Sequence, residues 1–393
     1  IIDDDNETKI KHMKGAAYAG DPDALYLYAK SLQFGLYGVK PNIVKANDFL
    51  RSAVRQDHIP SMIQLASNYY GGYGVPKNFY RAFGLYKKAS DLDDKDGQAF
   101  MGSLIMMGRG TTLPYTEGKN ILENLYLRKD CPIAKGVYSA VCAGDKNSSL
   151  DTEQIKSLLI ESAEGGYSAA YRNLAQFYIN KKRKTALEYL KRAADEYYIP
   201  AMREYAQLVE EDYLNPNSDD DKKKSKKDKK DKKDKKKDKK SKESSIEDAI
   251  EYYKKASDAG DIETYKKYNE LLIFGPNSGA TLKKMKDKDK AKFINDAITQ
   301  KGNSYAMVLY ANSIIKTEPE EGAHYMQSAA QLKDPYGLFG WALCLFRGTG
   351  TSKDTKQGLK FLDLSLKKGC TTDGVTTLSD VFSRLEKNDD WDT

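Results

Sequence analysis

The sequence predicts an all-α protein, a superhelix (solenoid) of about nine to ten similar helix pairs. Two observations lead to this fold class. A small or β-branched residue recurs along the chain, mostly at intervals between 31 and 42 residues. Several units also contain a Gly-x-Gly turn between two amphipathic stretches that are each too short to be stable alone. A period in the thirties with two helices per unit is typical of α-solenoids.

The first helix of each unit is defined by its small positions. In the clearest unit, Ser61, Ala66 and Tyr69 have offsets 0, +5 and +8, which a period of 3.6 places on one side of a helix. We expect these positions to lie where helices meet. Offset 0 is occupied by Ala24, Ser61, Gly97, Val137, Ala170, Ala201, Thr264, Ala306, Gly337 and Gly374. Offset +5 is occupied by Ala29, Ala66, Gly102, Cys142, Ala175, Ala206, Asn269, Ala311, Ala342 and Ser379.

The second helix of each unit is predicted from a candidate N-cap followed by small residues at +4 and +11. The candidate caps are Asn42, Asn78, Ser245 and Asp354, with Thr116 and Asp151 as weaker copies. The small residues that follow them are Ala46, Ala53, Ala82, Ala89, Ala249, Ala256, Gly358 and Ser365. This agreement between distant segments indicates that the two-helix unit repeats.

Gly-x-Gly turns lie between the two helices of several units, as at Gly72–Gly74, Gly108–Gly110 and Gly348–Gly350. A phosphate-binding loop would follow a strand and continue into Gly-Lys-Ser/Thr, and these turns do neither. We interpret them as turns that need positive φ, which glycine adopts readily. Gly74 is therefore assigned a structural role.

The clearest unit reads Leu-Ala-Ser-Asn-Tyr-Tyr-Gly-Gly-Tyr-Gly-Val from Leu65 to Val75, and its second helix contains Lys-Lys-Ala ending at Ala89. This pattern resembles the Sel1-like repeat. This repeat is related to the tetratricopeptide repeat but has a Gly-rich turn between its helices. The resemblance covers nearly the whole chain, with degenerate units near Val137 and Thr264. It implies a right-handed superhelix that acts as an adaptor holding partners in protein assemblies.

Charge and composition divide the chain. We predict repeats over 1–213 with a partial first unit, a Lys/Asp-rich insertion over 214–245, repeats over 246–388 and an acidic tail over 389–393. Residues 219–242 contain 15 Lys and 7 Asp, a charge of +8, so the rest of the chain carries −1 of the total +7. The insertion cannot bury apolar surface and is expected to be disordered. A solvated spacer, a weak polyanion-binding arm and a nuclear-import signal remain open.

The chain shows no local pattern for catalysis, a cofactor or a metal site. His12, His58 and His324 have no metal-ligand neighbours, and the four cysteines lack a repeating pair. A reducing, cytoplasmic location is favoured, with the nucleus or, given the sequons at Asn6 and Asn147, the ER lumen as alternatives. The chain begins without Met and with part of a repeat, so we expect a fragment or a processed product.

A partner is expected on the free face of the first helices, because offsets +2, +3 and +6 point away from the helix contacts. If these helices line the concave side, the partner-binding residues are Tyr26, Lys30, Gln64, Ser67, Arg172 and Arg203. The convex side and the ends of the superhelix remain alternatives. The predicted function is a non-catalytic adaptor that binds other proteins. The alternatives are a regulatory region of an enzyme and a polyanion or membrane-surface tether through the lysine-rich insertion.

Overall fold

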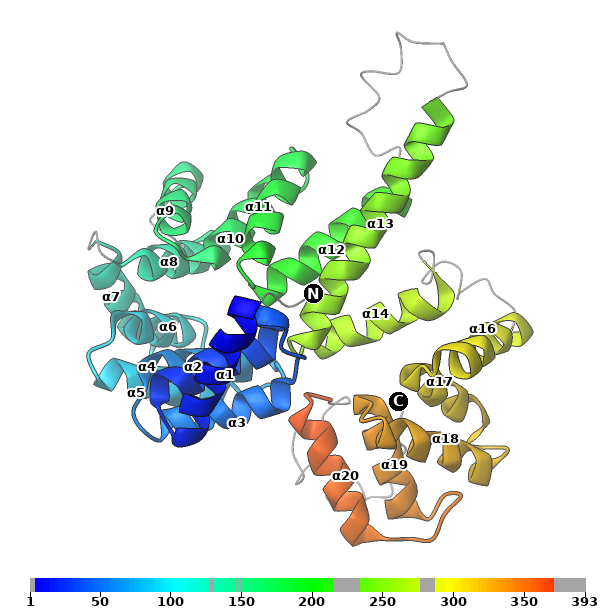
Figure 1. Cartoon of the computed structure of the whole chain (residues 1–393). Coiled ribbons are helices and arrows are strands. Elements are labelled where there is room, and N and C mark those ends of the chain that lie inside the picture. The colour runs from blue at the N-terminus through cyan, green and yellow to red at the C-terminus, as the bar shows by residue number, and fades with distance from the viewer. Residues whose placement is uncertain are drawn as a thin grey trace.

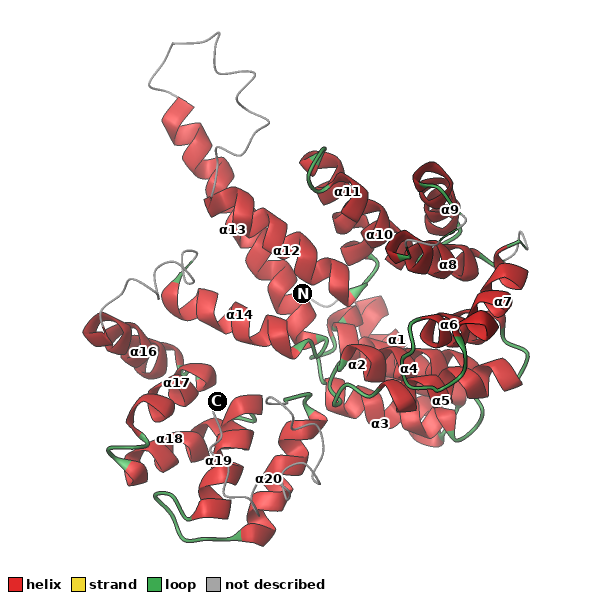
Figure 2. Cartoon of the chain, turned by 180° about the vertical axis from the view of Figure 1, so that it is seen from behind, coloured by secondary structure: helices red, strands yellow, loops and turns green. Residues whose placement is uncertain are grey.

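A computed structural model describes residues 4–127, 131–145, 148, 150–214, 234–275 and 287–370. These residues form nineteen α-helices, a short 3-10 helix at Leu36–Gly38 and no strand (Figure 2). Successive helices pack as pairs, and the pairs stack in chain order into a superhelix (Figure 1). The predicted all-α solenoid is confirmed.

The helices form nine pairs, preceded by α1 (Asp4–Ala19) from a partial unit. The first helices of the pairs are α2 (Pro22–Phe34), α4 (Ile59–Gly71), α6 (Lys95–Met106), α8 (Pro132–Gly144), α10 (Ser168–Tyr178), α12 (Ile199–Leu214), α14 (Ile262–Phe274), α17 (Ser304–Ile314) and α19 (Pro335–Arg347). The second helices are α3 (Ile43–Val54), α5 (Phe79–Asp91), α7 (Tyr115–Tyr126), α9 (Thr152–Glu164), α11 (Arg183–Asp195), α13 (Asp234–Asp258), α16 (Asp287–Lys301), α18 (Pro319–Gln331) and α20 (Thr355–Lys367).

The recurring small residues lie where helix backbones approach each other. A Cβ on Gly97 of α6 would be 2.7 Å from Cβ of Ala89 in α5, and one on Gly337 of α19 would be 2.5 Å from Cβ of Ala329 in α18. In both units, offset 0 therefore meets the second helix of the preceding unit. The alanines singled out in the sequence are all buried; they are Ala24, Ala29, Ala66, Ala82, Ala89, Ala170, Ala175, Ala201, Ala206, Ala256, Ala306, Ala311 and Ala342.

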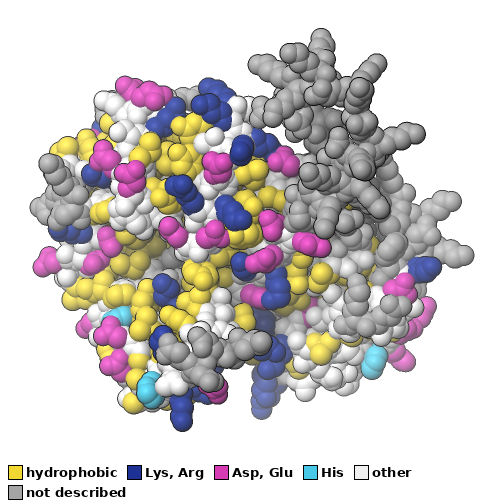
Figure 3. Space-filling model, turned by 45° about the horizontal axis from the view of Figure 1, so that its top comes forward, with side chains coloured by type: hydrophobic (Ala, Val, Ile, Leu, Met, Phe, Trp, Pro, Cys, Tyr) yellow, Lys and Arg dark blue, Asp and Glu magenta, His cyan; other side chains and the backbone are white. Residues whose placement is uncertain are grey.

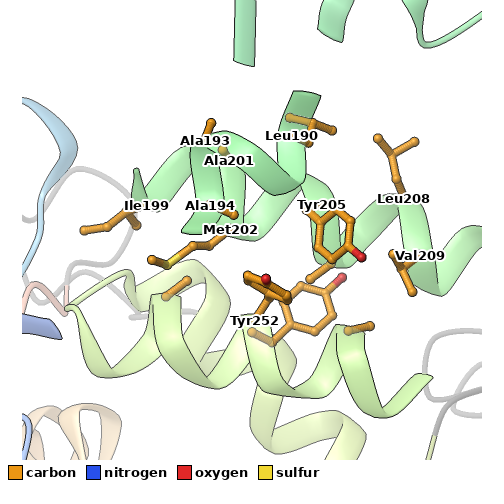
Figure 4. Close-up of a cluster of buried hydrophobic side chains, with 14 of the residues drawn as sticks. Leu190, Ala193, Ala194, Ile199, Ala201, Met202, Tyr205, Leu208, Val209 and Tyr252 are labelled. Carbon is orange, nitrogen blue, oxygen red and sulfur yellow. The ribbon is translucent and has the colours of Figure 1, made fainter. Parts of the chain in front are cut away.

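The core is a succession of apolar clusters between neighbouring helices. The largest lies between α11, α12, α13 and α14, and Figure 4 shows part of it. There Met202 and Tyr205 of α12 face Tyr252 of α13, and the Tyr205 and Tyr252 rings meet edge to face at 4.8 Å between centroids. Burial of such rings and alkyl chains stabilises helices that are individually too short to persist in water.

Three of the predicted N-caps are confirmed. The side chains of Asn42, Asn78 and Asp354 accept a hydrogen bond from the backbone amide three residues later, at 3.1, 2.9 and 2.8 Å. The weaker candidate Asp151 forms a capping box with Gln154.

The other two candidate caps, Ser245 and Thr116, were wrong. Ser245 lies inside α13, which begins at Asp234, and Thr116 lies inside α7, which begins at Tyr115. Lysine has a high helix propensity. A helix anchored by buried residues from Ile246 onward can therefore extend back into the lysine-rich segment.

The Gly-x-Gly turns have the positive φ that was predicted, for example 61° at Gly108 and 71° at Gly110. The structure adds a second reason for the second glycine. A Cβ on Gly110 would lie 2.1 Å from the Phe79 carbonyl oxygen, and one on Gly350 would lie 1.9 Å from the Pro319 carbonyl oxygen. The turn thus packs on the start of the second helix in the preceding unit.

Some of the predicted segments lie outside the described residues. These are residues 215–233 of the lysine-rich insertion, the tenth unit at Gly374 and Ser379, and the acidic tail 389–393. In the described part of the chain, no helix combines the length and apolar composition that a membrane-spanning segment requires.

The superhelix also curls back on itself, which the sequence did not predict. The turn between α4 and α5 lies against the loop between α13 and α14, where the amide of Gly74 donates to the carbonyl of Gly260 at 3.3 Å. Gln33 of α2 donates to the carbonyl of Ala259 at 3.5 Å. The early and late units therefore enclose a space between them.

Candidate partner-binding cavity

A cavity of about 520 Å³ lies where the superhelix closes, and we call it the central cavity. Its walls come from α2, α4, α10 and α12, from the turn at residues 71–73, from the loop at residues 196–198 and from the start of α14. Gly369, just after α20, also lines it. Units that are far apart in the sequence thus share one concave surface.

The structure brings together five of the six residues predicted to bind a partner. Lys30, Gln64, Ser67, Arg172 and Arg203 line the central cavity. The sixth, Tyr26, lies beside them: the Lys30 ammonium is 5.7 Å from the centre of its ring.

Arg172 forms the best-defined polar contact of the cavity wall. Its Nε donates to both carboxylate oxygens of Glu204 at 3.0 Å, and Gln176 donates to the same carboxylate at 2.9 Å. Burial disfavours the charged guanidinium, but the hydrogen bond and charge of Glu204 outweigh it, so the pKa of Arg172 is raised. The Arg172–Glu204 pair links α10 to α12, and its two opposite charges are paired within the cavity wall.

Arg203 forms a second ionic cluster with the start of α14. Its Nη1 is 3.1 Å from Asp261 and 2.6 Å from Glu263. The hydroxyl of Thr264 also donates to Asp261, at 2.8 Å. Burial raises the pKa of Asp261, and the positive charge of Arg203 partly offsets this. This cluster fixes α14 against α12.

Aromatic side chains form the rest of the wall, a role that the sequence pattern did not predict. The rings of Phe34 and Tyr197 are 5.3 Å apart, and Tyr70, Tyr73 and Tyr198 also line the cavity. Burial raises the pKa of Tyr198 to about 12, so its phenol stays neutral at physiological pH. Tyr197 and Tyr198 lie between helices, so the spacing of residues on first-helix faces does not indicate them.

Two lysines of the cavity lack an ion-pair partner among the described residues. Lys30 is half-buried beside Tyr26, and Lys77 is exposed after the turn. The remaining charges of the lining are Glu196 and the two ionic clusters already described. On the face shown in Figure 3, basic and acidic side chains are likewise interspersed among hydrophobic ones. This mixture lacks the single-sign field that favours a polyanion.

His58 has hydrogen-bond partners that resemble those of a hydrolase. Its Nδ1 is 2.8 Å from the Ser61 hydroxyl and its Nε2 is 3.0 Å from Asp23. Ser61, however, is fully buried at a helix contact, whereas a nucleophile must reach its substrate. The arrangement joins the start of α4 to α2.

The Gly108–Gly110 turn does not form an anion site, because its arginine already has partners. Arg109 lies over the Phe79 ring at 5.2 Å and donates to the Tyr70 hydroxyl, so its guanidinium is held by aromatic neighbours. The described residues contain no group of three or more His, Cys, Asp or Glu placed to hold a metal ion. A second, shallow hollow of about 810 Å³ lies at the Gly348–Gly350 turn, where it is lined by Glu318, Glu320 and Glu321.

The paired helices, close-packed small positions and enclosed concave surface define an α-solenoid repeat protein. Six stretches match the family model described as Sel1 repeat, and the chain belongs to the Sel1 repeat family. The matched residues are 22–58, 59–94, 168–198, 241–261, 304–334 and 335–370. The α8–α9 and α14–α16 pairs are unmatched, as expected for the degenerate units near Val137 and Thr264, and so is the α6–α7 pair.

Two solved structures are similar to this chain. One is a protective antigen of uropathogenic Escherichia coli strains that displays an SLR fold, with 16% identity over 91% of this chain and 79% of that chain, and a TM-score of 0.29. The other is a Sel1 repeat protein from Oxalobacter formigenes, with 13% identity over 96% of this chain and 90% of that chain, and a TM-score of 0.32. A search of curated proteins found no match.

Proposed function

We propose that this protein is a non-catalytic adaptor that binds segments of other proteins in the central cavity. Sel1 repeats typically mediate protein–protein interactions. The observation that carries the proposal is the convergence of Lys30, Ser67 and Arg172 on one concave surface, although they come from units far apart in the sequence. A volume of about 520 Å³ falls within the range of ligand-binding pockets.

The chemistry of the wall supports a peptide partner rather than a nucleic acid. Tyrosine and arginine are the residues that most often dominate protein interfaces, and the lining contains both. The ammonium groups of Lys30 and Lys77 are available to a carboxylate, while Phe34 and Tyr197 offer an apolar surface. The proposed partner is an extended segment that carries a carboxylate next to an apolar side chain.

Two cavity variants and two matched surface variants test this proposal. Lys30→Glu reverses an unpaired cavity charge, and Ser67→Arg fills the cavity. Lys184→Glu and Ser157→Arg make the same changes at exposed positions of α11 and α9. We expect a discrete set of proteins to copurify with the wild type and the surface variants, and recovery to fall at least about tenfold with the cavity variants.

Photo-crosslinking locates the partner directly. A photoreactive residue at Ser67 should crosslink to a discrete partner peptide, whereas one at Ser157 should not. Equal recovery by all four variants, with crosslinks only from Ser157, would place the partner at α9, away from the central cavity, and contradict the proposal.

The same purification separates the two other candidate functions. Deleting residues 219–233 removes much of the lysine-rich segment and leaves α12 and α13 whole. Salt-sensitive recovery of nucleic acid or anionic lipid that disappears with this deletion would favour the tether. Recovery of one enzyme whose activity changes on binding would favour a regulatory role.

A further inference from the structure

The contact that closes the superhelix joins segments that lie far apart in the sequence. We call it the clasp: the turn at residues 72–75, the Ala259–Gly260 pair and Gly369. Besides the hydrogen bond from Gly74 to Gly260, Gln33 donates to Ala259 across a sequence separation of 226 residues. In an ordinary solenoid each unit contacts only its neighbours.

Tyr73 anchors the clasp in the core of the distant units. Its side chain is 9% exposed and belongs to the apolar cluster formed by α11 to α14, together with Ile199 and Ala259. Tyr37 is the corresponding residue in the turn of the preceding unit, and it is 48% exposed. The same motif position is therefore a surface tyrosine in one unit and a buried anchor in the next.

Two glycines make room for the clasp. A Cβ on Gly260 would lie 2.7 Å from the amide nitrogen of Gly74 and 3.0 Å from the carbonyl carbon of Tyr73. A Cβ on Gly369 would lie 2.8 Å from the carbonyl oxygen of Gly72. Backbone atoms cannot move aside as a side-chain tip can, so an alanine at either position would force the two segments apart.

A buried amide network holds the turn in the shape that the clasp needs. Gln33, Asn47 and Asn68 are all fully buried. Asn47 donates to the carbonyls of Tyr73 and Gly74 at 3.1 and 3.3 Å, and Asn68 donates to Asn47 at 2.8 Å. Gln33 donates both to Asn68, at 3.1 Å, and to Ala259 across the clasp.

We propose that the clasp is a separable contact that assembles the central cavity. The Tyr73 turn and α4 supply one wall, while Arg203 and the start of α14 supply the opposite wall. Opening the clasp separates these walls while each helix pair stays packed on its neighbours. A ligand that touches both walls binds only the closed form, so binding and closure favour each other. This functional consequence rests on the proposed function, whereas closure is a property of the free protein.

The test compares two variants with two matched controls in the full chain. Tyr73→Ala removes the anchor, and Tyr37→Ala makes the same change at the exposed equivalent. Gly260→Ala adds the clashing Cβ, and Gly20→Ala makes the same change in the equivalent Gly-Asp loop. Gly20 has φ +94°, close to the +101° of Gly260, but no atom of the described residues lies within 4 Å of its Cβ position.

We expect Tyr73→Ala and Gly260→Ala to enlarge the radius of gyration in small-angle scattering and to speed hydrogen exchange in residues 72–75 by at least about fivefold. Circular dichroism should show that helix content is unchanged. Tyr37→Ala and Gly20→Ala should match the wild type in both measurements. Identical compactness and exchange in each pair would overturn the proposal. Global unfolding of Tyr73→Ala or Gly260→Ala beside a folded control would also overturn it, because the contact would then not be separable.

These outcomes are independent of the proposed function. If the clasp opens in a variant and the recovery of partners is unchanged, the proposal about the clasp stands and the central cavity is not the binding surface. If partners are no longer recovered although the clasp stays closed, the cavity is supported as the binding surface and the proposal about the clasp is rejected.

Discussion

The backbone amide of Gly74 donates a hydrogen bond to the carbonyl of Gly260, and this contact joins the Gly-x-Gly turn of an early unit to the loop of a late one. Stability in an open solenoid is approximately a sum of terms for units and for neighbouring interfaces. Here the contact between Gly74 and Gly260 adds a third contribution to stability, from units that are not neighbours. Substitutions at Tyr73 and Gly260 should therefore affect each other in a double-mutant cycle, although about 190 residues separate them along the chain.

Replacing Asn68 with alanine should strongly destabilise the fold. Asn68 is fully buried, accepts from Gln33 at 3.1 Å and donates to Asn47 at 2.8 Å. Its loss leaves buried amide groups unsatisfied, which we expect to cost about 2–4 kcal/mol in the free energy of unfolding measured with urea. Asn180→Ala, at an exposed position, should stay within about 0.5 kcal/mol. Similar values for the two variants would show that the network contributes little.

The two glycines of the turn after α6 should differ in their sensitivity to substitution. Both have positive φ, so alanine costs roughly 1–2 kcal/mol of backbone strain at either position. Among the residues that the structure describes, a Cβ on Gly108 would meet no atom within 4 Å, whereas one on Gly110 would meet the Phe79 carbonyl oxygen at 2.1 Å. Gly110→Ala should therefore destabilise by about 1–3 kcal/mol more than Gly108→Ala in thermal or urea unfolding. Equal losses would argue against close packing of this turn.

The confirmed cap Asn78 and the rejected cap candidate Ser245 should respond differently to alanine. The Asn78 side chain accepts from the Arg81 amide at 2.9 Å, so Asn78→Ala should lower the free energy of unfolding by about 1 kcal/mol. Ser245 lies in the interior of α13, where alanine is the better helix former, so Ser245→Ala should be neutral or slightly stabilising. A loss of about 1 kcal/mol in Ser245→Ala would mean that the helix begins at Ser245 after all.

Cys344 should make stability depend on alkaline pH. Burial raises the pKa of its thiol from 9.0 to about 11. Below about pH 9 the thiol is neutral in both the folded and the unfolded chain. Between about pH 9 and 11 only the unfolded chain releases the proton, so the contribution to stability falls as pH rises, by up to about 2–3 kcal/mol.

Urea unfolding at several pH values in that interval checks this expectation. The wild type should lose stability more steeply with pH than Cys344→Ala, which has no thiol to titrate. Parallel pH profiles for the two proteins would contradict the prediction. Native Cys344 should also react slowly with a thiol reagent near pH 8 and quickly once the chain is unfolded, because the thiolate is the reactive form.

The helix pairs and their contacts could be predicted because they depend on local patterns. The spacing of Ala66 and Ala89 alone predicts that they lie on buried helix faces. Asn78 predicts the start of a helix, because its side chain can accept from the backbone amide three residues later. The error at Ser245 has a local cause as well. Ser245 stands at the spacing expected of a cap, whereas the lysine-rich segment before it has enough helix propensity to continue the helix N-terminally.

The candidate site was partly predictable for the same reason. The free face of the first helices follows from helix period, and it led to Lys30, Ser67 and Arg172. It could not lead to Tyr197 or Asp261, because these lie in or beside loops whose position depends on the packing of neighbouring units.

The sequence by itself determined an all-α Sel1 repeat solenoid, the helix caps Asn42, Asn78, Asp151 and Asp354, and the small residues at helix contacts. Only the tertiary structure decided that the superhelix closes and that Tyr73 is a buried anchor while Tyr37 is exposed. The physical reason is that closure depends on the angles between successive units, which accumulate along the solenoid. No local window of sequence contains that sum, so the central cavity and its clasp appear only when all the units are packed together.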